Sequence, residues 1–220
     1  FSIFLLSRID YTEPQKAFQK SFIDSVKTSF RNLFEILKKN IPYRHYEVSF
    51  MLYGFAFMST KAVITLFYKE ALDLNYSSVA FYENSFNILT IALLPLFGKI
   101  IGRTDPRRFV VYTYLALALF IFFVGVTEYF PLNTNFFGIE IYYFLLLAII
   151  FKGIFAATMA LSWSIGSSYF CKKEEAGNYQ SVHLTLTGAR GLIAPLIGIY
   201  FYELLDFTGT FGIAVLSLSA

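Results

Sequence analysis

Four charged residues lie inside long apolar stretches of the sequence, where charge is rare. They are Lys61, Glu83, Lys152 and Arg190, and Glu83 is followed by the polar residues Asn84 and Asn87. Ionisable groups in an apolar environment are costly to bury, and they are retained mainly where they bind an ion, a polar solute or one another. Each one alone could be structural, with Lys61 and Glu83 reaching an interface and Arg190 bonding backbone carbonyls. Their spread over four separate stretches favours a binding or gating function for the set.

The chemistry expected of these residues is recognition of an anionic group. Lys152 and Arg190 lie far from both ends of their stretches, and the guanidinium of Arg190 can hold a carboxylate or phosphate through two parallel hydrogen bonds. Lys61 and Glu83 fall at similar depths if their stretches are helices, at about 1.5 Å per residue, so we predict an ion pair between them. These residues therefore indicate a small polar solute that carries negative charge.

Catalytic and metal-binding chemistry finds little support in the sequence. His45 and His183 are the only histidines, Cys171 is the only cysteine, and neither histidine lies in a spacing typical of a hydrolase or a zinc enzyme. A glycine-rich phosphate-binding loop is absent as well. We therefore expect no enzyme, no catalytic residue, no metal site and no cofactor.

The elements that must position these residues are membrane-spanning helices. Hydrophobic residues make up 56% of the 220-residue chain and charged residues only 15%, against about a quarter in soluble domains. The apolar residues form blocks of about 20, the length that a helix needs to cross a bilayer. The predicted fold class is an all-α, polytopic transmembrane bundle. The predicted spans are residues 46–69, 79–101, 109–129, 139–165 and 179–204, with a sixth from 207 to 220.

The two ends of the sequence are expected to be cuts within a longer protein. As a helix, residues 207–220 would reach only about 21 Å, short of a hydrocarbon core of about 30 Å. Residues 1–7 read as the end of a preceding span.

Basic residues alternate between the loops and predict the orientation of the bundle. The loops of residues 8–45, 102–108 and 166–178, with Lys99 at the edge of one, hold fourteen Lys and Arg, whereas the three alternate loops hold only Lys69. Cytoplasmic loops are the ones enriched in these residues, so we expect this set to be cytoplasmic, in a bacterial inner (plasma) membrane. Because the basic residues cluster in loops, the net charge of +3 does not indicate a nucleic-acid partner.

The first of these loops is predicted to contain an amphipathic helix over residues 15–39. Apolar residues recur there at steps of three and four, with Lys and Arg on the other side, and Pro42 is expected to end the helix. The apolar stripe is Phe18, Phe22, Val26, Phe30, Leu33 and Leu37. Such a helix could lie on an anionic leaflet, but we favour packing on the protein's own cytoplasmic face as a connector.

The loop after the second predicted span resembles a motif of the major facilitator superfamily, G-x-x-x-D-R-x-G-R-R. Gly102 stands in place of the motif's acidic residue, Asp105 in place of its second glycine, and the arginine pair comes one position late. The residues that match are Gly98, Arg103, Arg107 and Arg108. The preceding basic helix resembles the connector between the two halves of such a transporter, and residues 184–198 resemble the fifth helix of the C-terminal half.

This resemblance implies the C-terminal six-helix half of a transporter, with the first, second, fourth and fifth helices lining a cavity. The function expected is secondary active transport, by alternating access, of a small polar solute that carries an anionic group. The further partners are the bilayer, a coupling ion and an N-terminal half of the same chain. The alternative is a non-transporting receptor or assembly factor on the same scaffold, in which Lys61, Lys152 and Arg190 would all be neutralised inside the protein.

Overall fold

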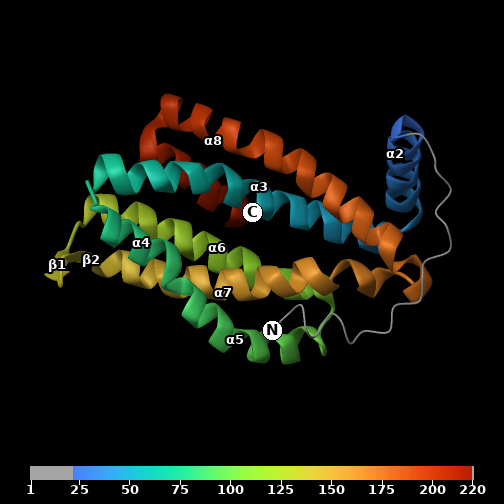
Figure 1. Cartoon of the computed structure of the whole chain (residues 1–220), viewed down its shortest axis with the longest axis horizontal. Coiled ribbons are helices and arrows are strands. Elements are labelled where there is room, and N and C mark those ends of the chain that lie inside the picture. The colour runs from blue at the N-terminus through green and yellow to red at the C-terminus, as the bar shows by residue number, and fades with distance from the viewer. Residues whose placement is uncertain (1–21, 220) are drawn as a thin grey trace.

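The computed structural model describes residues 22–219, which form a bundle of long helices (Figure 1). The sequence-based prediction of an all-α polytopic bundle is confirmed, because five helical segments are long and apolar enough to cross a membrane. They are Ile41–Ala71, Tyr76–Ile101, Pro106–Tyr129, Tyr143–Ile165 and Lys173–Ser219. The predicted tail of an earlier span, residues 1–7, and the connector as far as residue 21, with Phe18, lie outside the described residues.

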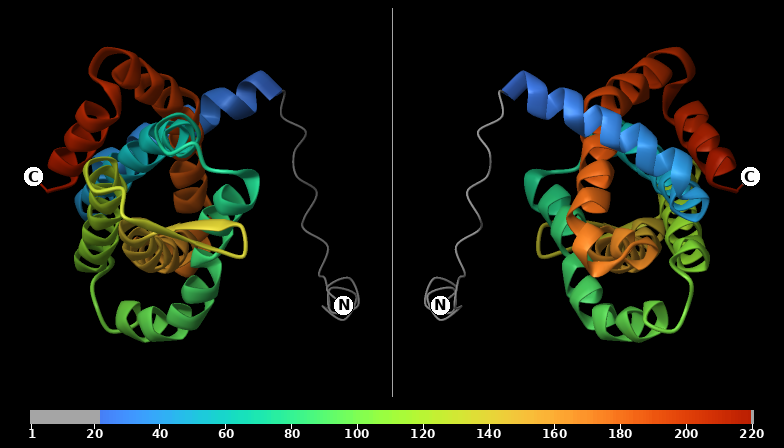
Figure 2. Two further views of the ribbon diagram at one scale, coloured as in Figure 1. Left: turned by 90° about the vertical axis from the view of Figure 1, so that its left-hand side faces the viewer. Right: turned by 90° about the vertical axis from the view of Figure 1, so that its right-hand side faces the viewer.

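Helix α2 (Phe22–Lys39) lies across one end of the bundle (Figures 1 and 2). It contacts α3 and α8, and Leu33 is buried there, whereas Phe30 and Phe34 are exposed. Part of the predicted apolar stripe thus packs on the protein itself. This arrangement agrees with a connector more closely than with a helix that is held only by lipid.

The first membrane-crossing segment consists of α3 (Ile41–Leu66) and a π-helical turn, η1 (Phe67–Ala71). It begins before the predicted residue 46 because Asn40 caps it, accepting a hydrogen bond from the backbone N–H of Tyr43 at 3.1 Å. Pro42 lies in the first turn, where its missing N–H costs nothing. Pro42 therefore helps to start α3, and the connector is shorter than predicted.

The second segment consists of two helices, α4 (Tyr76–Asn84) and α5 (Phe86–Ile101), which meet at Ser85. Asn75 caps α4 through the backbone N–H of Ser78, at 2.9 Å. The cap places the start of the segment at Tyr76 rather than at the predicted residue 79. The break at Ser85 falls directly beside the polar residues that follow Glu83.

A β-hairpin connects α6 (Pro106–Tyr129) to α7 (Tyr143–Ile165) at the end of the bundle opposite α2 (Figure 1). Its strands, β1 (Asn133–Phe136) and β2 (Ile139–Tyr142), are antiparallel, and Phe137 and Gly138 between them have φ of 49° and 78°. Positive φ at both central residues suits a two-residue hairpin turn. The prediction that the fourth span begins at residue 139 is therefore wrong, because residues 139–142 form β2.

Helix α8 (Ala176–Ser219) follows two short 3₁₀ turns, η2 (Ser167–Phe170) and η3 (Lys173–Glu175), and contains the fifth and sixth predicted spans. The backbone is non-helical at Asp206, where φ is 59°, and the chain reverses there, so that the last turns run back toward the α2 end (Figure 1). The predicted boundary between 204 and 207 agrees with this reversal.

Helices α3 and α8 run side by side from the α2 end (Figure 1). They approach closely at Gly198. A Cβ atom at Gly198 would overlap the backbone carbonyl of Ser59, so only glycine allows this separation. Close approach through small residues is how helices associate in lipid, where burial of apolar surface contributes little. This contact sets the register between the two helices that carry one of the candidate sites.

Candidate functional site

Glu83 on α4 and Lys152 on α7 form an ion pair, with 3.1 Å between Oε2 and Nζ. The ammonium group also lies 4.6 Å from the ring centre of Phe86 and 5.6 Å from that of Phe120. Lys152 is buried, while the Glu83 side chain keeps 34% of its surface exposed. Aromatic faces and a carboxylate both stabilise a buried cation, so this α4–α7 pair joins two helices around one charge.

The predicted ion pair between Lys61 and Glu83 is wrong, because Glu83 pairs with Lys152 instead. Similar depth along two helices does not decide which side chains face one another, since rotation about each helix axis matters as well. Lys61, on α3, is exposed. Among the described residues, Lys61 has no carboxylate within ion-pair distance.

Asn84 and Asn87 are exposed at the break between α4 and α5. The side-chain amide of Asn84 donates to the carbonyl of Ala80 at 2.7 Å, and that of Asn87 donates to the carbonyl of Asn84 at 3.0 Å. Both side chains therefore satisfy helix carbonyls at the interruption. Because they follow Glu83 closely in the sequence, both residues lie beside the α4–α7 pair.

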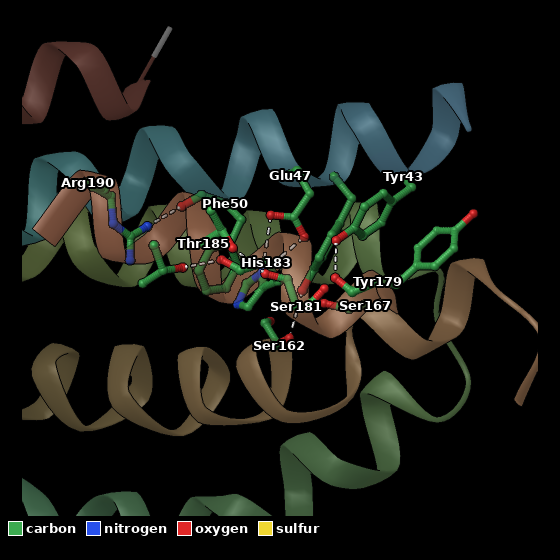
Figure 3. Close-up of polar contacts among 12 residues, drawn as sticks. Tyr43, Glu47, Phe50, Ser162, Ser167, Tyr179, Ser181, His183, Thr185 and Arg190 are labelled. Atoms are coloured by element: carbon green, nitrogen blue, oxygen red, sulfur yellow. Dashed lines mark hydrogen bonds and ion pairs between the residues drawn. The ribbon is translucent and has the colours of Figure 1, made fainter. Parts of the chain in front are cut away.

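Arg190 is buried between α8 and α3, with 7% of its surface exposed (Figure 3). Its Nη1 donates to the carbonyl of Phe50 at 3.0 Å, and its guanidinium carbon lies 5.4 Å from the ring centre of Phe50. A side chain at Gly54 would overlap this guanidinium, so the glycine makes room for it. The sequence left open that Arg190 only bonds backbone carbonyls, and the structure shows such a bond.

Glu47 on α3 and His183 on α8 form a second pair, which sequence reasoning missed (Figure 3). The imidazole Nδ1 lies 3.0 Å and 3.2 Å from the two carboxylate oxygens, and the two residues are 1% and 0% exposed. The rings of Phe50 and Trp163 cover the imidazole, at 4.3 Å and 5.1 Å between centres. This α3–α8 pair is therefore closed off from solvent by aromatic rings.

A signal for the α3–α8 pair is present in the sequence. Glu47 and His183 lie at matching distances from the starts of two segments that both begin on the predicted cytoplasmic side. Glu47 falls at the edge of the predicted span of residues 46–69, and the start of α3 at Ile41 moves it inside the helix. The helix boundary, and not the residue types, concealed the pair.

The loop motif adopts a capping structure at the start of α6. Asp105 accepts hydrogen bonds from the backbone N–H of Arg107, at 2.9 Å, and from the Arg107 guanidinium. These contacts with Arg107 lower the pKa of the Asp105 carboxyl from its ordinary value. Arg103 and Arg108 are exposed, and a Cβ at Gly98 would meet no other atom within 4 Å. The aspartate that stands in place of the motif's glycine thus has a local role as a helix cap.

Residues 22–219 contain no group of three or more His, Cys, Asp and Glu side chains that could hold a metal ion. Besides the α4–α7 pair and the α3–α8 pair, the charged site candidates among the described residues are Lys61 and Arg190.

Comparison with known proteins identifies one family. The family model of the Major Facilitator Superfamily matches residues 5–219. No curated protein and no solved structure is significantly similar to the chain. The matched range includes both ion pairs and the loop of residues 102–108.

Proposed function

The chain belongs to the major facilitator superfamily of membrane transporters, and from this premise we propose that it moves a small polar solute by secondary active, alternating-access transport. The observation that carries the proposal is the cluster of Lys61, Glu83 and Lys152. Three helices, α3, α4 and α7, each contribute one charged side chain to it. Charged side chains at membrane depth mark solute and ion pathways more often than structural contacts.

The cluster lies near the middle of the bundle. Lys152 is nine residues from the start of α7 at Tyr143, which places it about 14 Å along a helix of 23 residues, or about 34 Å. Transporters that work by alternating access hold the solute near the midplane, where both sides of the membrane can reach it in turn. The depth of the cluster is the one that this mechanism requires.

The charge of the cluster favours a solute with an anionic group. Glu83 offsets Lys152, and Lys61 adds a further positive charge on the exposed surface of α3. A carboxylate or phosphate on the solute would offset the charge of Lys61, for which the described residues provide no carboxylate within ion-pair distance. Because Arg190 is buried and bonded to α3, we assign the solute contact to Lys61 rather than to Arg190.

The non-transporting alternative requires Lys61, Lys152 and Arg190 all to be neutralised inside the protein. Lys152 meets this requirement through Glu83, and Arg190 is buried against a carbonyl. Lys61 is exposed. An exposed cation at this depth favours the transporter.

Uptake into proteoliposomes tests the proposal. The full-length protein would be supplied with a panel of radiolabelled carboxylates, phosphates, amines and sugars, and we expect saturable uptake of an anionic solute. Lys61→Gln should reduce that uptake strongly. The matched control is Lys69→Gln on the same segment, where the native lysine forms an exposed pair with Asp73 at 3.0 Å. Saturable uptake of a neutral sugar or an amine that Lys61→Gln leaves unchanged would contradict the proposal.

The orientation is proposed on the same basis, with residues 8–45, 102–108 and 166–178 cytoplasmic in a bacterial inner membrane. Cys171 is the only cysteine, so it can be labelled without other changes in this part of the protein. In intact cells an impermeant thiol reagent should not label Cys171, but it should label Thr134→Cys in a Cys171→Ser background. Labelling of Cys171 from outside would show that the orientation is the opposite of the proposed one.

A further inference from the structure

We propose that one face of α2 binds the surface of an anionic membrane. The helix has two apolar faces. One of them packs on the bundle, where α2 contacts α3 and α8 and Leu33 is only 6% exposed. The other carries Phe30 and Phe34, one turn apart, which are 52% and 68% exposed. The described part of the bundle therefore leaves an aromatic surface of α2 open.

Exposed cations lie beside the two rings. Lys27 precedes Phe30 by three residues, Arg31 precedes Phe34 by three and Lys38 follows it by four, so all five side chains lie along one side of the helix. Aromatic rings with Lys and Arg beside them are typical of helices that lie on an anionic bilayer surface. Lysine is depleted in the interfaces between proteins. The composition of this face therefore fits lipid headgroups better than a protein partner.

The acidic residues of α2 do not cancel its positive charge. Glu35 forms an exposed pair with Lys39 at 3.7 Å, and Asp24, in the first turn, is the other acid of the helix. Four Lys and Arg against these two acids leave a net charge of +2 on residues 22–39. The charge of the helix is thus complementary to that of an anionic lipid surface.

The position of α2 places this face at the level of the lipid headgroups. The helix lies across the ends of the spans, which run close to the membrane normal, so α2 runs along the plane of the membrane (Figures 1 and 2). Only Asn40 separates it from the 31-residue segment Ile41–Ala71. At about 1.5 Å per residue this segment is about 46 Å long, close to the thickness of about 40–45 Å of a bilayer with its headgroups. A helix at the end of this segment is therefore within reach of the headgroups.

The two faces of α2 thus bind different partners, the bundle through Leu33 and the membrane through Phe30 and Phe34. In the proposed orientation the membrane surface is that of the cytoplasmic leaflet, which is negatively charged. Because the attraction is between surface charges, salt should weaken it. This binding surface does not depend on which solute is carried.

Tryptophan emission at position 34 tests the proposal. The reporter is Phe34→Trp in a Trp163→Phe background of the full-length protein, since Trp163 is the only tryptophan in the sequence. Any tryptophan outside residues 1–220 would be replaced by phenylalanine. The protein would be placed in lipid nanodiscs with brominated acyl chains, because bromine quenches a tryptophan that lies among the lipids. Nanodiscs of phosphatidylglycerol, which is anionic, would be compared with nanodiscs of phosphatidylcholine, which has no net charge.

We expect stronger quenching in phosphatidylglycerol than in phosphatidylcholine. The difference should disappear in about 1 M salt, where the Debye length is about 3 Å. Thr28→Trp, about a third of a turn away around the same helix, should be quenched less in either lipid. Both leaflets of a nanodisc have the same composition, so the result does not depend on the orientation of the bundle.

Charge variants of the Phe34→Trp reporter separate attraction to lipid from other contacts. Arg31→Gln combined with Lys38→Gln should lower the ratio of bound to unbound α2 in phosphatidylglycerol, by roughly fivefold for each basic residue removed. The matched control is Glu35→Gln combined with Lys39→Gln, which removes an exposed pair without changing the net charge and should keep the difference between the lipids. Circular dichroism and gel filtration show whether each variant is folded.

Two results would overturn the proposal. Equal quenching in the two lipids at low salt would show that the charge of the membrane does not matter. Blue-shifted emission that neither lipid quenches would show that another part of the protein covers Phe34.

Discussion

The two ion pairs of this bundle contain the same acidic residue type but differ in their surroundings. Glu47 is 1% exposed, and its partner His183 is covered by the rings of Phe50 and Trp163. Glu83 keeps a third of its side-chain surface exposed, and its partner Lys152 is a lysine that also contacts two aromatic rings. The enclosed pair joins two helices out of reach of a solute, whereas the open pair is accessible to one. Surroundings, and not residue type, separate the two roles.

The largest difference between the two regions should be in stability. Glu47→Ala removes one partner of a fully buried pair and leaves His183 without it, so the free energy of unfolding should fall by about 3–5 kcal/mol. Glu83→Ala should cost less, because water can solvate Lys152 through the exposed side of the pair. Both values can be measured by denaturant-induced unfolding of the reconstituted protein. Equal losses, or a larger loss for Glu83→Ala, would show that the two pairs do not differ in burial.

A double-mutant cycle should identify the true partner of Glu83. Glu83→Gln and Lys152→Met, alone and combined, should show a coupling energy of about 0.5–3 kcal/mol in unfolding, because the double variant leaves no unpaired charge. The same cycle with Lys61→Met in place of Lys152→Met is the matched control and should be additive. Additivity in the first cycle and coupling in the second would show that Glu83 pairs with Lys61 and not with Lys152.

A smaller effect should follow from separating α3 and α8. Gly198→Ala places a methyl group against the Ser59 carbonyl and should lower the free energy of unfolding by about 1–3 kcal/mol. The control on the same helix is Gly188→Ala, where a Cβ meets no atom within 4 Å. The emission of Trp163, whose ring lies 5.1 Å from that of His183, should change in Gly198→Ala only. If both variants behave alike, close packing at Gly198 does not hold the α3–α8 pair together.

The sequence predicts the spans well because their apolar blocks follow directly from the thickness of a bilayer. It also identifies Glu83, Lys152 and Arg190, since charge inside such a block stands out. The partner of Glu83 could not be predicted, because depth along a helix says nothing about rotation around its axis. The hairpin before α7 was missed because Ile139 and Ile141 extend an apolar run, while the turn at Phe137 and Gly138 decides the local structure.

The central claim is that Lys61 faces an aqueous cavity where a solute binds, and thiol modification tests it most directly. Lys61→Cys and its neighbour Thr60→Cys, each in a Cys171→Ser background of the full-length protein, would be exposed to a water-soluble anionic thiol reagent. Thr60 is 1% exposed, so it controls for a position at nearly the same depth on the buried face of α3. The account predicts rapid modification at position 61, slowed by the transported solute, and almost none at position 60. Failure of the reagent to modify position 61 in the folded protein would contradict it, because Lys61 would then face lipid.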